Sequence, residues 1–310
     1  MKIVASYIEP DLDGTSCMYA YSELLNRLGE NASYHIWNEP KQETQIVCDM
    51  FGIKLGGEKE FKDGDKYIIV DLNNYGQVDP NIKREDIIEI IDHHGISRDL
   101  YLYTSCERIQ IDKIGAAATI VTERYKESGL VPSREAAILL YYGIISNSIN
   151  LKANITSARD KAATDWLKSV CSDISEEKIK DIFMKKSNIA DENLRLEMEC
   201  EIPMTAHNKQ VLVGQLEMCD IETFINNKKD LINKILTDID SEKDLDFLFV
   251  NMVDILNGYS LIYTLDEESK KMMNRLFDLE FEGPMARFDG LVQRKEITKA
   301  IRDFDGELEF

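Results

Sequence analysis

The sequence predicts an α/β protein with a mostly parallel sheet, helices on both faces of that sheet, and a smaller C-terminal α/β domain. Short apolar runs rich in β-branched residues, such as YIIVD and IIEIID, alternate with amphipathic stretches in the first half of the chain. Strands that are apolar on both faces fit a parallel sheet covered on both sides. With 310 residues and an apolar share of 44%, the chain can build two domains with real cores.

The expected elements follow in order along the chain. In the first half, strands are expected at residues 2–8, 34–37, 67–71 and 87–92, and helices from Thr15 or Ser16 to Gly29, then at 43–50, 115–128 and 133–145. A second α/β unit has strands at 210–218, 245–256 and 259–265 and a helix at 267–279. The pattern loosens around KKSNIADE. We therefore expect a domain at 1–185, a linker at 186–194 and a second domain at 195–310.

Composition narrows the class of partner. The formal net charge of −20 repels nucleic acid and anionic membranes, so neither is expected as a partner, although an anionic substrate is still compatible with it. The start, MKIVASYIEP, lacks a secretory signal pattern, and no run approaches the roughly 20 apolar residues of a membrane span. Six cysteines are scattered without a C-x-x-C pair, which is typical of reduced thiols. The sequence therefore predicts a cytoplasmic protein.

Polar residues follow three of the predicted strands. Each cluster taken singly is also typical of a turn or a helix N-cap. In a parallel sheet, however, strand ends of the same polarity gather at one edge, and turn chemistry does not explain why all three clusters fall there. The clusters are Glu9-Pro10-Asp11-Leu12-Asp13-Gly14, Asp71-Leu72-Asn73-Asn74 and Asp92-His93-His94, and we expect Asp11, Asp13, Asp71, Asp92 and His93 to converge.

Carboxylates that converge at one sheet edge need a cation to balance their charge. Several of them cannot stay ionised close together without a cation between them. Carboxylates combined with imidazole suit a divalent ion such as Mn²⁺ or Mg²⁺. Two such ions would hold a phosphoryl group and activate a water. The sequence therefore predicts a divalent metal site that acts on a phosphorylated anion.

On these motifs the chain resembles the DHH phosphoesterase superfamily and, within it, the manganese-dependent family II inorganic pyrophosphatases. The resemblance extends over nearly the whole length. Asp11 and Asp13 match the paired aspartates of the first motif, Asp71 matches the second, and Asp92-His93-His94 is the motif that names the superfamily. The IGAAAT run looks like the helix start that follows. Three C-terminal segments (GQLE, VDIL and LVQRK) resemble the second type of DHH-associated domain. The segment typical of the nuclease-type domain is absent, which argues against an oligonucleotide exonuclease.

The resemblance implies roles for individual residues. Asp11, Asp13, Asp71 and His93 would be metal ligands, and Asp92 and His94 would be catalytic, with His94 also contacting phosphate. Arg294 and Lys295 would bind the substrate phosphate from the second domain, with the active site in the cleft between the two domains. The family also commonly pairs as a homodimer through the sheet edge of its first domain.

Four positions depart from the family pattern. One of them, Asn193 near the linker, stands where the family has a further phosphate-binding lysine. Tyr7 stands where a metal-binding histidine is expected, Asn147 where a bridging aspartate is expected, and Glu296 where a second lysine is usual. A neutral phenol and an amide are weak metal ligands. We therefore predict one firm metal site near Asp13, Asp71 and His93, and a second site that is weak or completed by substrate oxygens.

Three functions remain open on this basis. The chain is a metal-dependent phosphohydrolase that cleaves a small phosphoanhydride or phosphoester, or a degenerate relative that binds phosphate or nucleotide ligands as a sensor or interaction protein. In the third case it is a structural or partner-binding protein whose polar clusters are relics. Retention of the acids, histidines and basic residues at all the motifs argues against this third function, because buried-edge carboxylates cost stability when they are unpaired.

Overall fold

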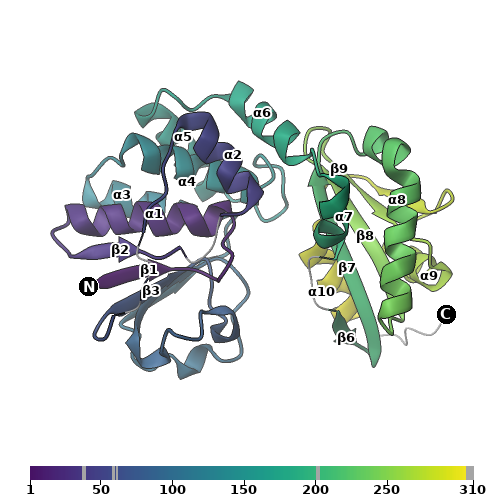
Figure 1. Cartoon of the computed structure of the whole chain (residues 1–310), viewed down its shortest axis with the longest axis horizontal. Helices are drawn as coiled ribbons and strands as arrows, with labels where there is room; N and C mark the ends of the chain where they lie inside the picture. Colours follow the sequence, from purple (N-terminus) through teal and green to yellow (C-terminus); the bar gives the residue numbers. More distant parts are fainter. Residues whose placement is uncertain (37–39, 58–59, 61, 200–202, 305–310) are drawn as a thin grey trace. The chain divides into compact units, whose positions relative to one another are not determined.

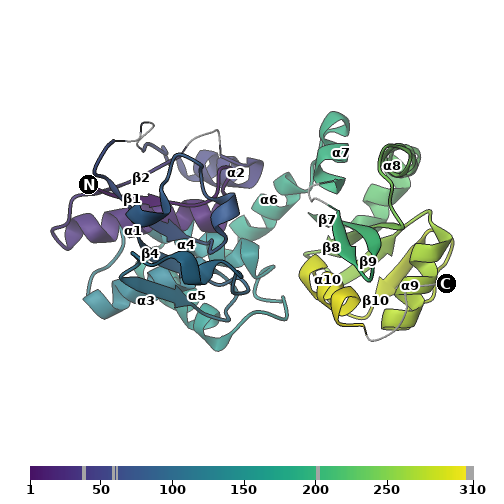
Figure 2. The same cartoon turned by 90° about the horizontal axis from the view of Figure 1, so that it is seen from below.

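The computed structural model describes residues 1–36, 40–57, 60, 62–199 and 203–304. The chain divides into two compact units, Met1–Ile182 and Phe183–Phe310, which we call the N-terminal and C-terminal units. Figures 1 and 2 show the elements of each unit. Every helix in the described part is too short or too polar to cross a bilayer.

The N-terminal unit is built on a five-stranded parallel sheet with the order β2-β1-β3-β4-β5. The parallel sheet predicted from the sequence is confirmed. The strand predicted at 34–37 is β2, which ends at Tyr34, while Trp37 lies outside the described residues. The strands are β1 (Lys2–Ala5), β2 (Ala32–Tyr34), β3 (Lys66–Val70), β4 (Ile87–Asp92) and β5 (Arg108–Ile111).

Helices cover one face of this sheet and short 3-10 helices cover the other. On the first face α1 and α3 contact the strands and pack against α4, and α5 packs on α3 and α4 (Figure 1). On the second face an apolar cluster joins the strands to the segment that carries η1–η3. The elements are α1 (Leu12–Arg27), α2 (Gln42–Phe51), η1 (Tyr75–Gln77), η2 (Arg84–Asp86), η3 (Leu100–Leu102), α3 (Ala117–Ser128), α4 (Arg134–Asn147), α5 (Ala158–Val170) and α6 (Glu176–Lys186).

Two helix starts differ from the sequence-based prediction. Thr15 and Ser16 do not cap α1; the helix begins at Leu12, because Asp11 Oδ1 accepts the backbone N–H of Gly14 at 3.0 Å and makes Asp11 the N-cap. The third predicted helix begins at Ala117 rather than Gly115. Both shifts place the start of a helix directly beside the polar clusters.

The C-terminal unit has a mixed sheet with the order β10-β9-β8-β7-β6, in which only β7 and β8 pair in parallel. Helices α7 and α8 pack on one face, and α9 and α10 on the other (Figure 2). The smaller C-terminal α/β domain is confirmed. Its elements are α7 (Asp191–Met198), β6 (Met204–Ala206), β7 (Lys209–Met218), α8 (Ile221–Glu242), β8 (Phe247–Asp254), β9 (Tyr259–Tyr263), α9 (Glu267–Phe277), β10 (Met285–Phe288) and α10 (Arg294–Asp303).

One glycine determines how α7 packs. A Cβ atom at Gly214 in β7 would lie 2.2 Å from the carbonyl oxygen of Met198, the last residue of α7. This contact is with backbone, so a side chain here could be accommodated only by moving the helix or the strand.

We predict that Gly214→Ala lowers the free energy of unfolding by about 1–3 kcal/mol or more, the cost typical of overpacking. Denaturant unfolding followed by circular dichroism measures this. Gly56→Ala is the control, because its Cβ would meet only the Tyr34 hydroxyl at 3.9 Å. Equal effects of the two substitutions would contradict the prediction.

Candidate metal centre

The polar clusters meet at the carboxyl edge of the N-terminal sheet. β1, β3 and β4 are adjacent parallel strands, so their chain ends share one edge. Side-chain ligand atoms of Asp71, His93 and His94 lie within 4.8 Å of one another. Asp13 Oδ2 lies 3.7 Å from His93 Nε2. The structure therefore brings together the strand-end residues that the sequence analysis expected to converge.

Asp13 is buried and fully engaged. Its two carboxylate oxygens accept the backbone N–H groups of Ala117 and Ala118, each at 2.8 Å, at the start of α3. α3 has no capping side chain of its own, so Asp13 caps it from α1. Burial raises the pKa of the Asp13 carboxyl, while His93 and these two N–H groups act to lower it. The carboxylate is thus held in one orientation.

Asp71 is buried with much less compensation. It is 2% exposed, and its Oδ1 atom has no hydrogen-bond partner among the residues that the structure describes. Burial, then the charges of Asp13 and Asp11, raise the pKa of its carboxyl well above the usual range. Its backbone is left-handed with φ +58°, a conformation that non-glycine residues adopt at a cost. Strain and an orphaned buried oxygen at one residue indicate a site built for a ligand.

The geometry fixes the tautomer of His93. Its Nδ1 lies 3.0 Å from the carbonyl oxygen of Ile114 and therefore donates a proton to it. Nε2 is left as a lone pair, 3.4 Å from the unpartnered Asp71 Oδ1. A carbonyl that receives the far ring N–H is a common way to orient a metal-binding imidazole.

Asp92 and His94 form a separate pair next to this site. His94 Nδ1 donates to Asp92 Oδ1 at 2.8 Å, and the His94 side chain is 56% exposed. This bond and the charge of Asp71 raise the pKa of His94, outweighing partial desolvation. The pKa of Asp92 is lowered because the hydrogen bonds and charge of His94 outweigh burial. The bond to Asp92 therefore orients the exposed His94 imidazole through Nδ1.

Asn73 holds this pair in place and was not singled out by the sequence analysis. Its amide nitrogen donates to Asp92 Oδ2 and to the carbonyl of Gly95, and its oxygen accepts the N–H of Ser97 at 2.6 Å. Its position two residues after Asp71 was the available signal.

Asp11 and Tyr7 occupy the other side of the predicted site. Asp11 caps α1, and its backbone N–H donates to the Tyr7 hydroxyl at 3.0 Å. Burial and the charges of Asp11 and Asp71 raise the pKa of Tyr7 well above its usual range, so the phenol is neutral. The charge of Asp11 acts on Asp13 and Asp71, although Asp11 is not in the cluster around His93.

An acid oxygen and an imidazole nitrogen face each other at this site. Asp71 Oδ1 lies 3.4 Å from His93 Nε2. Adjacent ligands of an octahedral ion at about 2.1 Å are about 3 Å apart, close to this separation. The cluster of Asp71, His93 and His94 is therefore compact enough to hold a metal ion, and its oxygen and nitrogen atoms are of the kinds that bind Mn²⁺ or Mg²⁺.

Asn147, at the end of α4, hydrogen-bonds to two of the site residues. Its amide nitrogen donates to Asp13 Oδ2 at 2.9 Å and to His93 Nε2 at 3.1 Å. A carboxylate at this position would add a metal ligand. The Asn147 amide instead hydrogen-bonds to atoms of Asp13 and His93 that a metal ion would otherwise bind. The departure seen in the sequence thus alters the metal centre directly.

Comparison with known proteins agrees with this geometry. Residues 2–144 match the family model described as DHH family, N-terminal domain. The chain is 25% identical to the manganese-dependent inorganic pyrophosphatase of Bacillus subtilis, covering 95% of each protein. It is 28% identical to a Clostridium acetobutylicum protein assigned the same activity, covering 96% of this chain and 97% of the relative.

The chain is a DHH family protein. It is related over nearly its full length to manganese-dependent, family II inorganic pyrophosphatases. Its fold also matches the crystal structure of a Methanococcus jannaschii protein assigned to family II, with a TM-score of 0.69 at 21% identity over 97% of this chain and 99% of the other.

The predicted basic residues lie at the start of α10 in the C-terminal unit. The backbone N–H of Arg294 donates to Gln215 Oε1 at 2.6 Å, which fixes the first turn against β7. The Lys295 side chain is exposed to solvent, and desolvation by the surrounding protein lowers its pKa. Glu296 accepts the N–H of Gln293 at 2.9 Å, so this departure from the family pattern caps the helix.

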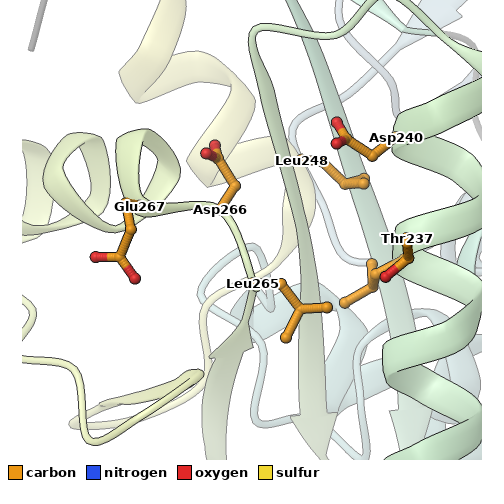
Figure 3. A pocket seen from close by; sticks show the side chains of 7 residues that line it. Thr237, Asp240, Leu248, Leu265, Asp266 and Glu267 are labelled. Atoms are coloured by element: carbon orange, nitrogen blue, oxygen red, sulfur yellow. The ribbon is translucent and has the colours of Figure 1, made fainter.

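One hollow in the C-terminal unit, of about 390 Å³, is lined by apolar and acidic side chains and by none of the predicted site residues. Leu248 and Leu265 lie in its lining with Asp240, Asp266 and Glu267 (Figure 3). Asp266 also caps α9, because it accepts the N–H groups of Glu268 and Ser269.

We predict that Asp71→Asn stabilises the metal-free protein at pH 7 by about 1–3 kcal/mol, because it removes a poorly compensated buried charge from a position where asparagine tolerates positive φ. The pKa of Asp71 is raised in the folded state, so the stability gained by the substitution is complete only above that raised pKa. The gain disappears as the pH falls below about 3.8, the ordinary pKa of an aspartate, because the carboxyl is then protonated in both states. Thermal melts in EDTA across pH measure it.

Asp13→Asn is the matched contrast. It replaces a carboxylate that two N–H groups require, so it should lower stability in the same melts. A loss of stability in both variants would contradict the assignment of Asp71 as the uncompensated carboxylate.

Proposed function

We propose that this protein is a divalent-metal-dependent phosphohydrolase that cleaves a small phosphoanhydride or phosphoester, with inorganic pyrophosphate as the first candidate. The observation that carries this proposal is the unpartnered Asp71 Oδ1 facing the Nε2 lone pair of His93. The relatedness to manganese-dependent pyrophosphatases supports the substrate class.

The chain's own residues divide the work in this proposal. Asp13, Asp71 and His93 hold one Mn²⁺ or Mg²⁺, which supplies Lewis-acid stabilisation of phosphate oxygens and activates a water when bound. His94, oriented by Asp92, donates a proton or hydrogen bond to the phosphoryl group. Arg294 and Lys295 supply the positive charge that binds the phosphate oxygens.

A second candidate has its own observation. The Asn147 amide satisfies the lone pairs of Asp13 and His93, and Tyr7 is neutral where the family has a histidine. Both features weaken a two-metal centre. A protein of this kind could bind a phosphate or nucleotide ligand without turnover and act as a sensor.

A phosphate-release panel distinguishes the two candidates. Pyrophosphate, tripolyphosphate, mononucleotides and cyclic dinucleotides are each tested with Mn²⁺, Mg²⁺ and Co²⁺. We expect Mn²⁺-dependent release from at least one phosphoanhydride, and a loss on the order of 100-fold or more in Asp71→Asn, which removes a charge from the metal site. Binding without release on every pair would favour the sensor.

We also predict that Asn147→Asp raises the number of tightly bound Mn²⁺ ions from one to two per chain. The substitution replaces an amide that donates to Asp13 and His93 by a carboxylate that can bridge two ions. Calorimetry and electron paramagnetic resonance of Mn²⁺ measure the stoichiometry.

Asn147→Ala serves as the control, because it removes the competing amide without adding charge. It should keep one ion and bind it more tightly. Two tight sites in the unsubstituted protein would overturn the proposal of a single firm site.

A further inference from the structure

A single backbone segment holds two of the proposed metal ligands. Between β5 and α3, the carbonyl of Ile114 receives the Nδ1–H of His93, and the N–H groups of Ala117 and Ala118 bind both oxygens of Asp13. The positions of these two ligands therefore depend on the conformation of residues 114–118. Whatever fixes this segment also fixes the imidazole tautomer and the carboxylate orientation.

Asp160 in the first turn of α5 fixes the segment. It is completely buried and accepts four hydrogen bonds. Oδ2 accepts from the N–H of Gly115 at 2.9 Å and from the N–H and hydroxyl of Ser157 at 2.7 Å each, and Oδ1 accepts from the Thr119 hydroxyl at 2.6 Å. Gly115 and Thr119 flank the backbone groups that hold Asp13, so the carboxylate clamps the segment from both ends.

The local sequence is fitted to this carboxylate. A Cβ atom at Gly115 would lie 3.1 Å from Asp160 Cγ, so a side chain here would crowd the carboxylate that the backbone N–H approaches. A carboxylate suits this position, because four donors converge on its two oxygens, three of them on Oδ2. The Ser157 to Asp160 spacing is that of a capping box, which accounts for only part of these contacts. The bonds to Gly115 and Thr119 lie outside that motif.

We propose that Asp160 is a positioning residue for the metal centre, which acts by holding residues 114–118 so that His93 presents Nε2 and Asp13 presents its carboxylate to a divalent cation. Its effect on metal binding rests on the proposed function. Its effect on the His93 tautomer does not, since that bond exists in the metal-free protein.

The test uses the full chain carrying Asp160→Ala, with two readouts. Imidazole ¹⁵N NMR of the metal-free protein reports the His93 tautomer, and calorimetry with Mn²⁺ alone reports affinity. We expect the unsubstituted protein to show the Nδ1–H tautomer and Asp160→Ala to show a mixture of tautomers. We also expect Mn²⁺ affinity to fall about 10–100-fold, the usual cost of losing an outer-shell partner.

Two further variants separate positioning from general destabilisation. Asp160→Asn keeps one oxygen for the N–H donors and should recover most of both readouts. Asp266→Ala removes a helix-capping carboxylate of α9 in the C-terminal unit, so it should lower stability while leaving the His93 tautomer and Mn²⁺ affinity unchanged.

Specific results would overturn the proposal. An unchanged His93 tautomer in folded Asp160→Ala would do so, as would an equal change in Asp266→Ala. If Asp160→Ala does not fold, Thr119→Val removes one of the four bonds without changing the side-chain shape, and a tautomer identical to the unsubstituted protein would overturn the proposal. If the unsubstituted protein binds no Mn²⁺, the proposed function fails while the tautomer readout still tests Asp160.

Discussion

Two carboxylates buried side by side, Asp13 and Asp71, are the constraint around which the N-terminal unit is arranged. Burial of both is tolerable only if donors or a cation compensate their charge. The fold gives Asp13 the free N–H groups at the start of α3, so that carboxylate serves as the missing cap of a helix. Asp71 receives no such partner at Oδ1 and sits on strained backbone. Asp13 therefore has a structural role as a helix cap in addition to its proposed role as a metal ligand. Asp71 depends on a bound ligand to compensate its charge.

The departures from the family pattern act in the same direction on this constraint. Tyr7 is neutral and accepts the backbone N–H of Asp11, and the Asn147 amide donates to Asp13 and His93. Each replaces a metal ligand by a group that hydrogen-bonds to the acids or imidazole that remain. Fewer carboxylates bind fewer cations, because the negative charge that holds two dications together is reduced. Both departures therefore favour the proposed single cation over a two-metal centre.

The sequence predicted the fold class and the convergence of the strand ends because those depend on periodicity and on the polarity of parallel strands. It was wrong about the start of α1, because the cap is Asp11 rather than Thr15 or Ser16; Asp11 accepts the backbone N–H of Gly14 and serves both as N-cap and as a predicted site residue. The role of Asn73 was missed although the residue lies in the second polar cluster, because its bond to Asp92 joins positions 19 apart. Asp160 was missed because its bond to Gly115 joins positions 45 apart, and such a tertiary contact leaves no local pattern.

The start of α10 bears on how this helix would bind an anion under the proposed function. Helix N-termini commonly bind phosphate through free backbone N–H groups. Here the N–H of Gln293 is taken by Glu296, and the N–H of Arg294 by Gln215, which also accepts from Asn251 of β8. The first turn is thus hydrogen-bonded to the sheet, and these two N–H donors already have acceptors within the protein. What it can offer an anion is the charge of Arg294 and Lys295, held on a rigid turn. Replacement of a lysine by Glu296 therefore exchanges one positive charge for a fixed helix start.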